Sequence, residues 1–223
     1  MMGHNHAMTG ALVGLVTLPW SPSGFVLGEV SWVVACAGAA LLPDFDTTHS
    51  KASRMWGPVS AGIAGLVGVL AGGHRRGTHD LVLAPVVAGG LAWVAALHPA
   101  SCTVVLALLI GLSLQALKPA PLVGRVSRAV SLSVSLGAGW WLVAGGIDPW
   151  HVGVVVALGV LVHVLGDLPT TEGIPMPLLW AFGTRRRLTL GLFEVNGLIE
   201  RWVITPALIF VVLTLAVRAM GWW

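Results

Sequence analysis

Histidines and aspartates gather in three short stretches of a chain in which only 9% of the residues are charged. The stretch LLPDFDTTHS spans residues 41–50, GHRRGTHD spans 73–80, and HVLGD spans 163–167. Imidazole nitrogens and carboxylate oxygens bind zinc, manganese and iron in proteins. These residue types in such a hydrophobic chain therefore indicate metal chemistry.

The HVLGD stretch places His163 and Asp167 four residues apart at the end of an apolar segment. On a helix this spacing puts both side chains on one face, where they can bind one ion. Ionisable groups in membrane segments are costly and usually functional. The alternative is a structural pair joined by a hydrogen bond.

Asp44 and Asp46 follow a long apolar run, and an extended loop would point both side chains to the same side. Two carboxylates so close repel each other unless a cation lies between them. The alternative is that both aspartates simply lie at the C-terminus of the preceding helix. This is less favourable, because the helix dipole disfavours anions at a C-terminus. At the start of the chain, His6 is a better ligand candidate than His4 because it lies nearer the first apolar segment.

The GHRRGTHD stretch combines two candidate ligands, His74 and His79, with two arginines. Guanidinium groups bind phosphate and carboxylate, so Arg75 and Arg76 are candidates for holding an anionic substrate. Asp80 is either a general base or a cap of the following helix.

The composition predicts an all-α integral membrane protein, with residues 1–223 forming one domain. The chain is 56% hydrophobic and its mean hydropathy is +0.88, whereas soluble domains are about 45–50% apolar and about 25% charged. The chain has no basic helix of the kind that binds nucleic acids, so a nucleic-acid partner is not expected. Cys36 and Cys102 lie in apolar runs without a C-x-x-C partner, so neither a disulfide nor a thiolate metal site is expected.

A topology with seven membrane spans places almost all lysines and arginines on one side of the membrane. Of the eight apolar segments, the glycine-rich 57–73 is the least convincing span, and we expect it to be re-entrant or packed within the bundle. The others are 7–20, 24–43, 81–97, 102–117, 129–147, 150–167 and 203–221.

With these seven spans, eleven of the twelve basic residues share one face and only Arg218 lies towards the other. The positive-inside rule makes that face cytoplasmic. The N-terminus and the candidate ligands fall on the same face. The proline-containing stretch 168–202 is then a cytoplasmic loop, with a lid or an interfacial helix as alternatives. The eleven residues are Lys51, Arg54, Arg75, Arg76, Lys118, Arg125, Arg128, Arg185, Arg186, Arg187 and Arg201.

Four motifs in order resemble the YdjM/YbcI-type family. They are H-x3-G at 6–10, LLPD-x-D-x3-S at 41–50, GHR-x2-TH at 73–79 and H-x3-D-x2-T-x2-G-x-P at 163–175. Members are described as metal-dependent hydrolases of the inner membrane, some of them LexA-regulated. The chain departs from the expected pattern at Asp80, where serine is expected, and at His49, which is displaced by two positions.

The resemblance implies a metal centre and a supporting set of residues. The supporting positions are Arg75, Thr78, Thr170 and Gly173. The metal centre would consist of His6, Asp44, Asp46, His74, His79, His163 and Asp167.

Together these features predict a membrane-bound hydrolase that cleaves an ester or phosphoester, including one in a lipid. One or two divalent ions, zinc first and manganese or iron next, would activate a water, with Asp46 or Asp80 as general base. Arg75, Arg76, Thr78 and Thr170 would bind the substrate. The partners expected are the lipid bilayer and an anionic small molecule or lipid; the oligomeric state stays open.

Two other functions compete with hydrolysis. One is a transporter or channel for a metal ion or a small anion, and the other is a structural metal that joins helices. Transport sites tend to lie near the midplane between broken helices. The candidate ligands gather at one face instead, which favours chemistry.

Overall fold

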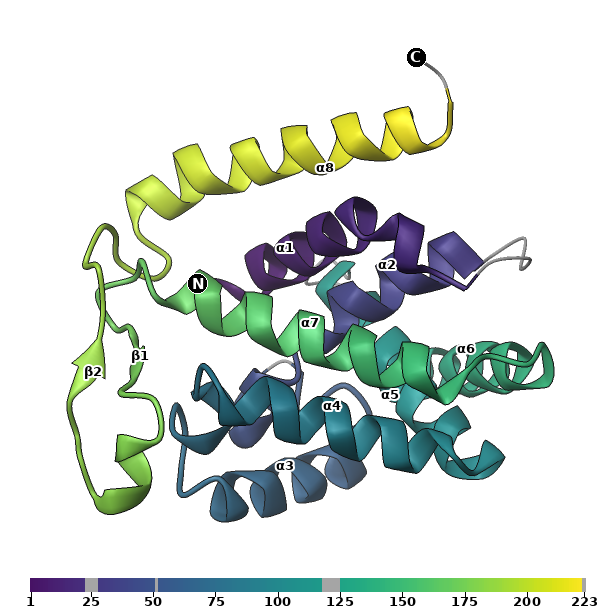
Figure 1. Cartoon of the computed structure of the whole chain (residues 1–223), viewed down its shortest axis with the longest axis horizontal. Helices are drawn as coiled ribbons and strands as arrows, with labels where there is room; N and C mark the ends of the chain where they lie inside the picture. The colour runs from purple at the N-terminus through teal and green to yellow at the C-terminus, as the bar shows by residue number, and fades with distance from the viewer. Residues whose placement is uncertain (23–27, 51, 118–124, 222–223) are drawn as a thin grey trace.

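The computed structural model describes residues 1–22, 28–50, 52–117 and 125–221, and most of them are helical (Figure 1). This confirms the all-α prediction. In chain order the α-helices of the described residues are α1 (Gly3–Val16), α2 (Gly28–Ala39), α3 (Pro58–Leu70), α4 (Leu83–Ala96), α5 (Pro99–Leu117), α6 (Arg125–Ala144), α7 (Pro149–Asp167) and α8 (Thr205–Ala219).

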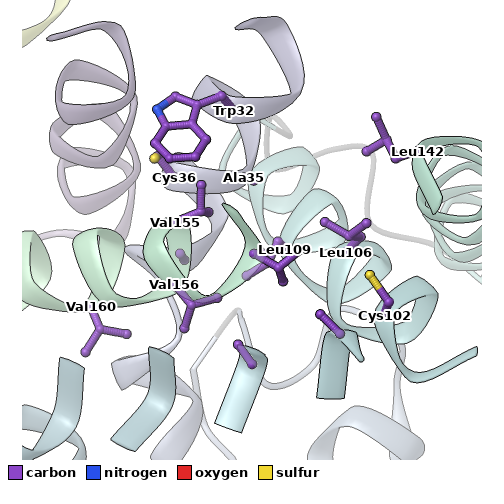
Figure 2. Packing of buried hydrophobic residues seen from close by; sticks show 14 of the residues in the cluster. Trp32, Ala35, Cys36, Cys102, Leu106, Leu109, Leu142, Val155, Val156 and Val160 are labelled. Carbon is purple, nitrogen blue, oxygen red and sulfur yellow. The ribbon is translucent and has the colours of Figure 1, made fainter. Parts of the chain in front are cut away.

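Helix α7 is the centre of the bundle and packs against α1, α2 and α4. Its start is well defined, because the Asp148 carboxylate accepts a hydrogen bond of 2.8 Å from the backbone N–H of Trp150 and Pro149 occupies the first turn. Val152, Val156 and Val160 are spaced four residues apart and share one buried face. They pack in a core that also contains Trp32, Cys36, Cys102 and Leu109 (Figure 2). Both cysteines are free, as predicted.

Small residues let α7 approach the end of α2 closely. A Cβ atom added at Gly159 would overlap the Cβ atom of Ala39 and lie 2.7 Å from the backbone nitrogen of Ala40. Small residues at such crossings are typical of membrane helices, whose association depends on close packing. The contact fixes the backbone of Ala40 beside the turn of α7 that carries His163.

Four stretches of the described residues are long and apolar enough to cross a membrane: Gly28–Asp46, Pro99–Ala116, Pro149–Asp167 and Glu200–Ala219. Helices α3 and α4 are apolar but shorter. The prediction of seven spans is therefore not confirmed by length and composition.

Helix α3, within the glycine-rich segment 57–73, lies at the edge of the bundle (Figure 1). Only Ser60 and Ala64 of this helix are buried. The expectation that this segment is packed within the bundle is wrong, because its glycines offer little side chain to bury and large side chains such as Val59, Leu66 and Val69 are exposed. It packs instead on η2 (Pro43–Asp46), a 3-10 turn that carries two of the predicted ligands.

The stretch 168–202 forms a small hairpin rather than an interfacial helix. Strand β1 (Ile174–Pro175) pairs antiparallel with β2 (Arg187–Leu188), and the 3-10 turn η5 (Leu179–Phe182) lies between them. A π-helical turn, η6 (Glu200–Ile204), then leads into α8. The buried Glu200 carboxylate ties this turn to α1, since it accepts hydrogen bonds from the Met2 N–H and the Asn5 amide.

Candidate metal centre

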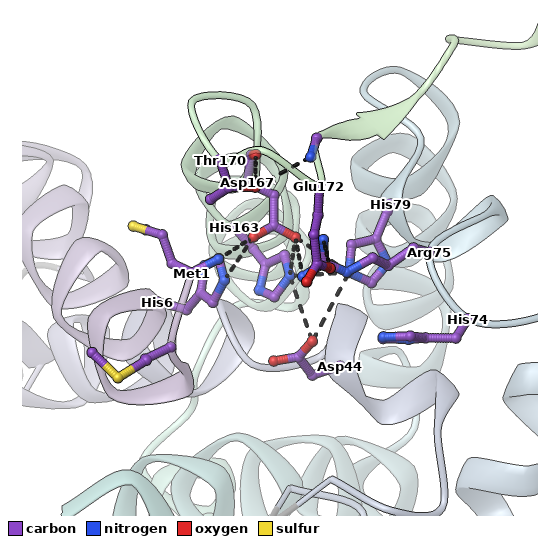
Figure 3. A network of polar contacts seen from close by, with 12 residues as sticks. Met1, His6, Asp44, His74, Arg75, His79, His163, Asp167, Thr170 and Glu172 are labelled. Atoms are coloured by element: carbon purple, nitrogen blue, oxygen red, sulfur yellow. Dashed lines mark hydrogen bonds and ion pairs between the residues drawn. The ribbon is translucent and has the colours of Figure 1, made fainter. Parts of the chain in front are cut away.

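Four segments that are far apart in the sequence bring histidines and aspartates together at one end of the bundle (Figure 3). The segments are the first turns of α1, the turn η2, the turn η3 (Gly77–His79) and the C-terminal end of α7. We call the following residues the five-residue cluster: His6, Asp44, His79, His163 and Asp167. Four of them are buried, and the Asp44 side chain is 25% exposed.

The side-chain atoms of the cluster converge at distances that suit a metal ion. The Nε2 atoms of His79 and His163 lie 3.2 Å apart. Each is 3.7 Å from Oδ2 of Asp167 and 3.9 Å from Oδ1 of Asp44. The His6 ring stacks on that of His163, with centroids 3.6 Å apart.

The cluster contains two overlapping groups that could each hold a metal ion. The first consists of His6, Asp44 and His163, and the second of His79, His163 and Asp167. In each group the potential ligand atoms lie within 4.8 Å of one another. Because His163 belongs to both groups, the cluster has donors for one ion or for a neighbouring pair.

Hydrogen bonds outside the cluster orient both histidines with a lone pair inward. Nδ1 of His163 lies 2.7 Å from the carbonyl oxygen of Ala40, which can only accept, so this nitrogen carries the proton. Nδ1 of His79 lies 3.0 Å from the hydroxyl of Thr78, which itself donates to Asp46. We therefore assign the proton of His79 to Nδ1 as well.

With these tautomers, the acceptor atoms Nε2 of His79, Nε2 of His163 and Oδ2 of Asp167 face one another in the protein interior. Two imidazole lone pairs 3.2 Å apart repel each other, and Oδ2 of Asp167 is buried without a hydrogen-bond partner. Buried polar atoms without partners are costly, whereas a cation among them would make every one of these contacts attractive. The donor set, imidazole plus carboxylate, suits a divalent transition metal.

Asp46 lies one layer outside the cluster and organises its neighbours. Its carboxylate accepts hydrogen bonds from Nδ1 of His74 at 2.6 Å, the backbone N–H of Arg75 at 3.0 Å and the hydroxyl of Thr78 at 2.6 Å. It also lies 3.5 Å from Nδ1 of His79. Carboxylates in this position orient a metal-binding histidine.

The different positions of Asp44 and Asp46 follow from the conformation of η2. An extended loop would point residues 44 and 46 the same way, but η2 is a 3-10 turn of about three residues per turn. Two residues apart on such a turn point in different directions. Asp44 therefore faces the cluster, while Asp46 faces the loop at 73–79.

His74, predicted as a ligand, lies in neither metal-binding group. Its side chain is 47% exposed and paired with Asp46. The hydrogen bond to Asp46 raises the pKa of His74, against burial, which lowers it. His49, the displaced histidine, is exposed and lies 3.1 Å from the Arg54 guanidinium.

Asp80, predicted as a possible general base, is committed to other contacts. One oxygen accepts from the N–H groups of Val82 and Leu83 at the start of α4, and the other from the Leu178 N–H and the Trp180 indole. Burial alone would raise the pKa of Asp80, but the hydrogen bonds outweigh it and lower that pKa. Asp80 thus caps α4 and ties the hairpin segment to the bundle.

The residues predicted to bind substrate have three different environments. Nη1 of Arg75 lies 2.7 Å from Glu172 and Nη2 lies 3.7 Å from Asp167, so this guanidinium borders the cluster. Arg76 is exposed. The hydroxyls of Thr78 and Thr170 are engaged within the protein, with Asp46 and with the Asp167 carbonyl respectively.

Gly173, a further motif position, donates its N–H to the Thr170 hydroxyl at 3.2 Å. The two residues therefore stabilise the end of α7, close to Asp167. They support the cluster through the backbone.

Three contacts to the cluster were not predicted from the sequence. The Ala40 carbonyl accepts from His163 and the Met1 amine donates to Asp167, whereas the Glu172 carboxylate acts indirectly, through Arg75 at the border of the cluster. Glu172 could have been suspected as an acid inside the fourth motif. The contact of the Ala40 carbonyl could not be predicted, because every residue type has a backbone carbonyl.

A bundle of apolar helices with buried histidines and aspartates at one end defines a helical membrane protein with a candidate metal centre. The chain belongs to the YdjM inner membrane protein family, which it matches over residues 1–223. This confirms the family predicted from the four motifs. No match was found among curated proteins or among solved structures.

Proposed function

We propose that this protein is a membrane-bound, metal-dependent hydrolase of ester or phosphoester bonds. The observation that carries the proposal is the convergence of His79 Nε2, His163 Nε2 and Asp167 Oδ2, which is buried without a hydrogen-bond partner. Asp44 gives the cluster a partly open side, whereas a purely structural metal would be fully enclosed.

A divalent ion held by the cluster would supply Lewis acidity, polarising the scissile bond and making a water more nucleophilic. Three imidazoles with carboxylates favour zinc, with manganese or iron as alternatives, and the two overlapping groups allow one ion or two. Asp46 and Asp80 are occupied by other contacts. We therefore assign the proton acceptor to Asp44, the partly exposed carboxylate of the cluster.

The proposed reaction adds one water across the scissile bond. For a phosphoester, the water oxygen bonds to phosphorus and the bond between phosphorus and the alcohol oxygen breaks. One proton of the water is accepted by Asp44 and passes to the leaving alcohol oxygen, and the other stays on the new phosphate. Arg75 borders the cluster, and Arg76, the next residue in the chain, is exposed, so an anionic substrate is favoured.

The proposal includes the topology with seven spans and a cytoplasmic site. His6 lies in the second turn of α1 and Asp167 is the last residue of α7, so the ligands lie at helix ends. A site at the end of the bundle supports chemistry at the membrane boundary over a transport pathway through the midplane.

The test is metal analysis of the purified protein combined with a screen of phosphoester, carboxyl-ester and amide substrates. We expect metal-dependent hydrolysis that disappears in His79→Ala and His163→Ala. His98→Ala, in the turn between α4 and α5, is the matched control and should behave like the unsubstituted protein. Hydrolysis that persists in a folded, metal-free His79→Ala/His163→Ala protein would refute the proposal.

A further inference from the structure

An apolar cavity of about 560 Å³ lies between α3 and α4. Ile63, Val67 and Leu70 line it from α3, and Val87 and Leu91 line it from α4. Its volume is within the range of about 300–1,000 Å³ that is typical of small-molecule sites. The cavity lacks the polar groups that would hold water or a polar ligand along the two helices, so its occupant must be apolar there.

One end of the cavity lies next to the candidate metal centre. Pro43 and Phe45, on either side of Asp44, line the cavity, as does Thr78, whose hydroxyl donates to Asp46. Trp180, held by Asp80, also lines it. The cavity therefore ends beside the five-residue cluster, at residues that adjoin Asp44 and His79 in the chain, which favours an occupant with an apolar body and a polar end.

The apolar part of the cavity lies where an occupant can enter from the membrane. Its walls are two short apolar helices whose outer side chains are exposed, among them Leu66 and Val69 on α3 and Val86 on α4. Such surfaces are stable only against lipid or another apolar surface. At the other end, the exposed Arg76 provides positive charge next to Gly77, which lines the cavity.

We propose that the acyl chain of a membrane phospholipid occupies this cavity and thereby places its phosphoester at the metal centre. The assignment of the phospholipid as substrate rests on the function proposed above, whereas its binding does not. Charge complementarity selects the phospholipid. The exposed Arg76 precedes Gly77, which lines the cavity, and it lies against Gly72 as Trp180 does, so its guanidinium can bind a phosphate there. Arg75 is already paired with Glu172 and Asp167.

Binding is tested on the full chain in nanodiscs of phosphatidylethanolamine and phosphatidylglycerol. The probe is a phosphatidylglycerol with a diazirine in the middle of one acyl chain, and crosslinks are mapped by mass spectrometry. We expect crosslinks at Val67 and Leu91 that are lost in Val87→Trp, where the indole fills the cavity. Val86→Trp, one residue away on the outer face of α4, should retain them.

A diacylglycerol with the same labelled chain distinguishes a phospholipid site from a general apolar site. We expect it to label Val67 and Leu91 more weakly than the phosphatidylglycerol probe does. Equal labelling by both probes, or labelling that is unchanged in folded Val87→Trp protein, would overturn the inference.

Hydrolysis rates for a long-chain lipid and a small phosphodiester test the role of the cavity separately from the hydrolase activity. We expect Val87→Trp to lower the ratio of long-chain phosphatidylglycerol to bis(p-nitrophenyl) phosphate hydrolysis by about tenfold, the scale of discrimination by an apolar pocket. Val86→Trp should leave that ratio unchanged. An unchanged ratio in Val87→Trp contradicts the cavity but not the hydrolase. If neither compound is hydrolysed while the crosslinks appear as expected, the hydrolase proposal fails and the lipid cavity stands.

Discussion

At the scale of single residues, the same side chain has different roles according to what faces it. Asp167 turns an oxygen that lacks a hydrogen-bond partner towards two imidazole nitrogens, whereas the Asp46 carboxylate accepts hydrogen bonds from the loop at 73–79. The first arrangement suits a metal ligand and the second suits a residue that orients ligands.

This difference predicts distinct effects on metal binding. Asp167→Asn should remove most of the bound metal, because a neutral amide replaces a ligand that carries charge. Asp46→Asn should retain metal but lower its affinity by about 10–100-fold, as for other residues that orient metal ligands. Metal titration monitored by calorimetry would measure both.

Asp148→Asn is the control for this comparison. It changes an aspartate at the opposite end of α7, where the side chain only caps the helix. Equal affinities for Asp46→Asn and the unsubstituted protein would show that Asp46 has no orienting role.

The His74–Asp46 pair predicts a pH dependence of stability. Because the pKa of His74 is raised in the folded protein, its contribution is complete below the ordinary value of 6.5 and disappears as the pH rises through the raised pKa. The effect should be small, since the side chain is 47% exposed. Thermal unfolding of the metal-free protein from mildly acidic to alkaline pH would detect it.

His74→Gln removes the titrating group from this pair and should flatten the stability curve over the same pH range. Superimposable curves for the two proteins would mean that the pair contributes nothing measurable.

At the scale of elements, close contacts between backbones hold the segments that carry the cluster. A Cβ atom added at Gly68 would collide with the backbone carbonyl oxygen of Asp46, so glycine allows α3 to rest directly on η2. The glycines of α3 are thus not equivalent, because a Cβ atom added at Gly62 would have no neighbour within 4 Å.

A pair of substitutions in α3 tests this distinction. Gly68→Ala should destabilise the protein by about 1–3 kcal/mol through overpacking and should weaken metal binding by displacing η2. Gly62→Ala should be neutral or stabilising by up to about 1 kcal/mol, the helix propensity of alanine over glycine. Thermal unfolding and metal titration of both variants provide the measurement. If the two variants behave alike, the contact between α3 and η2 does not position the site.

At the scale of the whole molecule, the proposed topology predicts which loops reach the cytoplasm. Arg76→Cys, beside the cluster, should react with a membrane-impermeant maleimide in inverted membrane vesicles and not in intact spheroplasts. His98→Cys should show the reverse. Cys36 and Cys102 are buried, so the unsubstituted protein provides an unlabelled background. Labelling of both positions from the same side would contradict the topology.

The class of protein, the family and all five residues of the cluster could be predicted from the amino-acid sequence alone. Hydropathy is a property of composition, and the spacing of His163 and Asp167 depends only on helix geometry, so both could be predicted without tertiary contacts. Four motifs in order were enough to identify the family, and they contain all five residues of the cluster.

Which of the predicted residues face one another follows only from the packing of distant segments. Asp44 and Asp46 could not be told apart in the sequence, because their roles depend on the 3-10 conformation of η2 and on the loop packed against it. In the sequence Asp80 is a candidate general base. In the structure its second oxygen accepts hydrogen bonds from the Leu178 N–H and the Trp180 indole, about a hundred residues away. Such contacts depend on how distant segments pack, which a local pattern of residues does not encode.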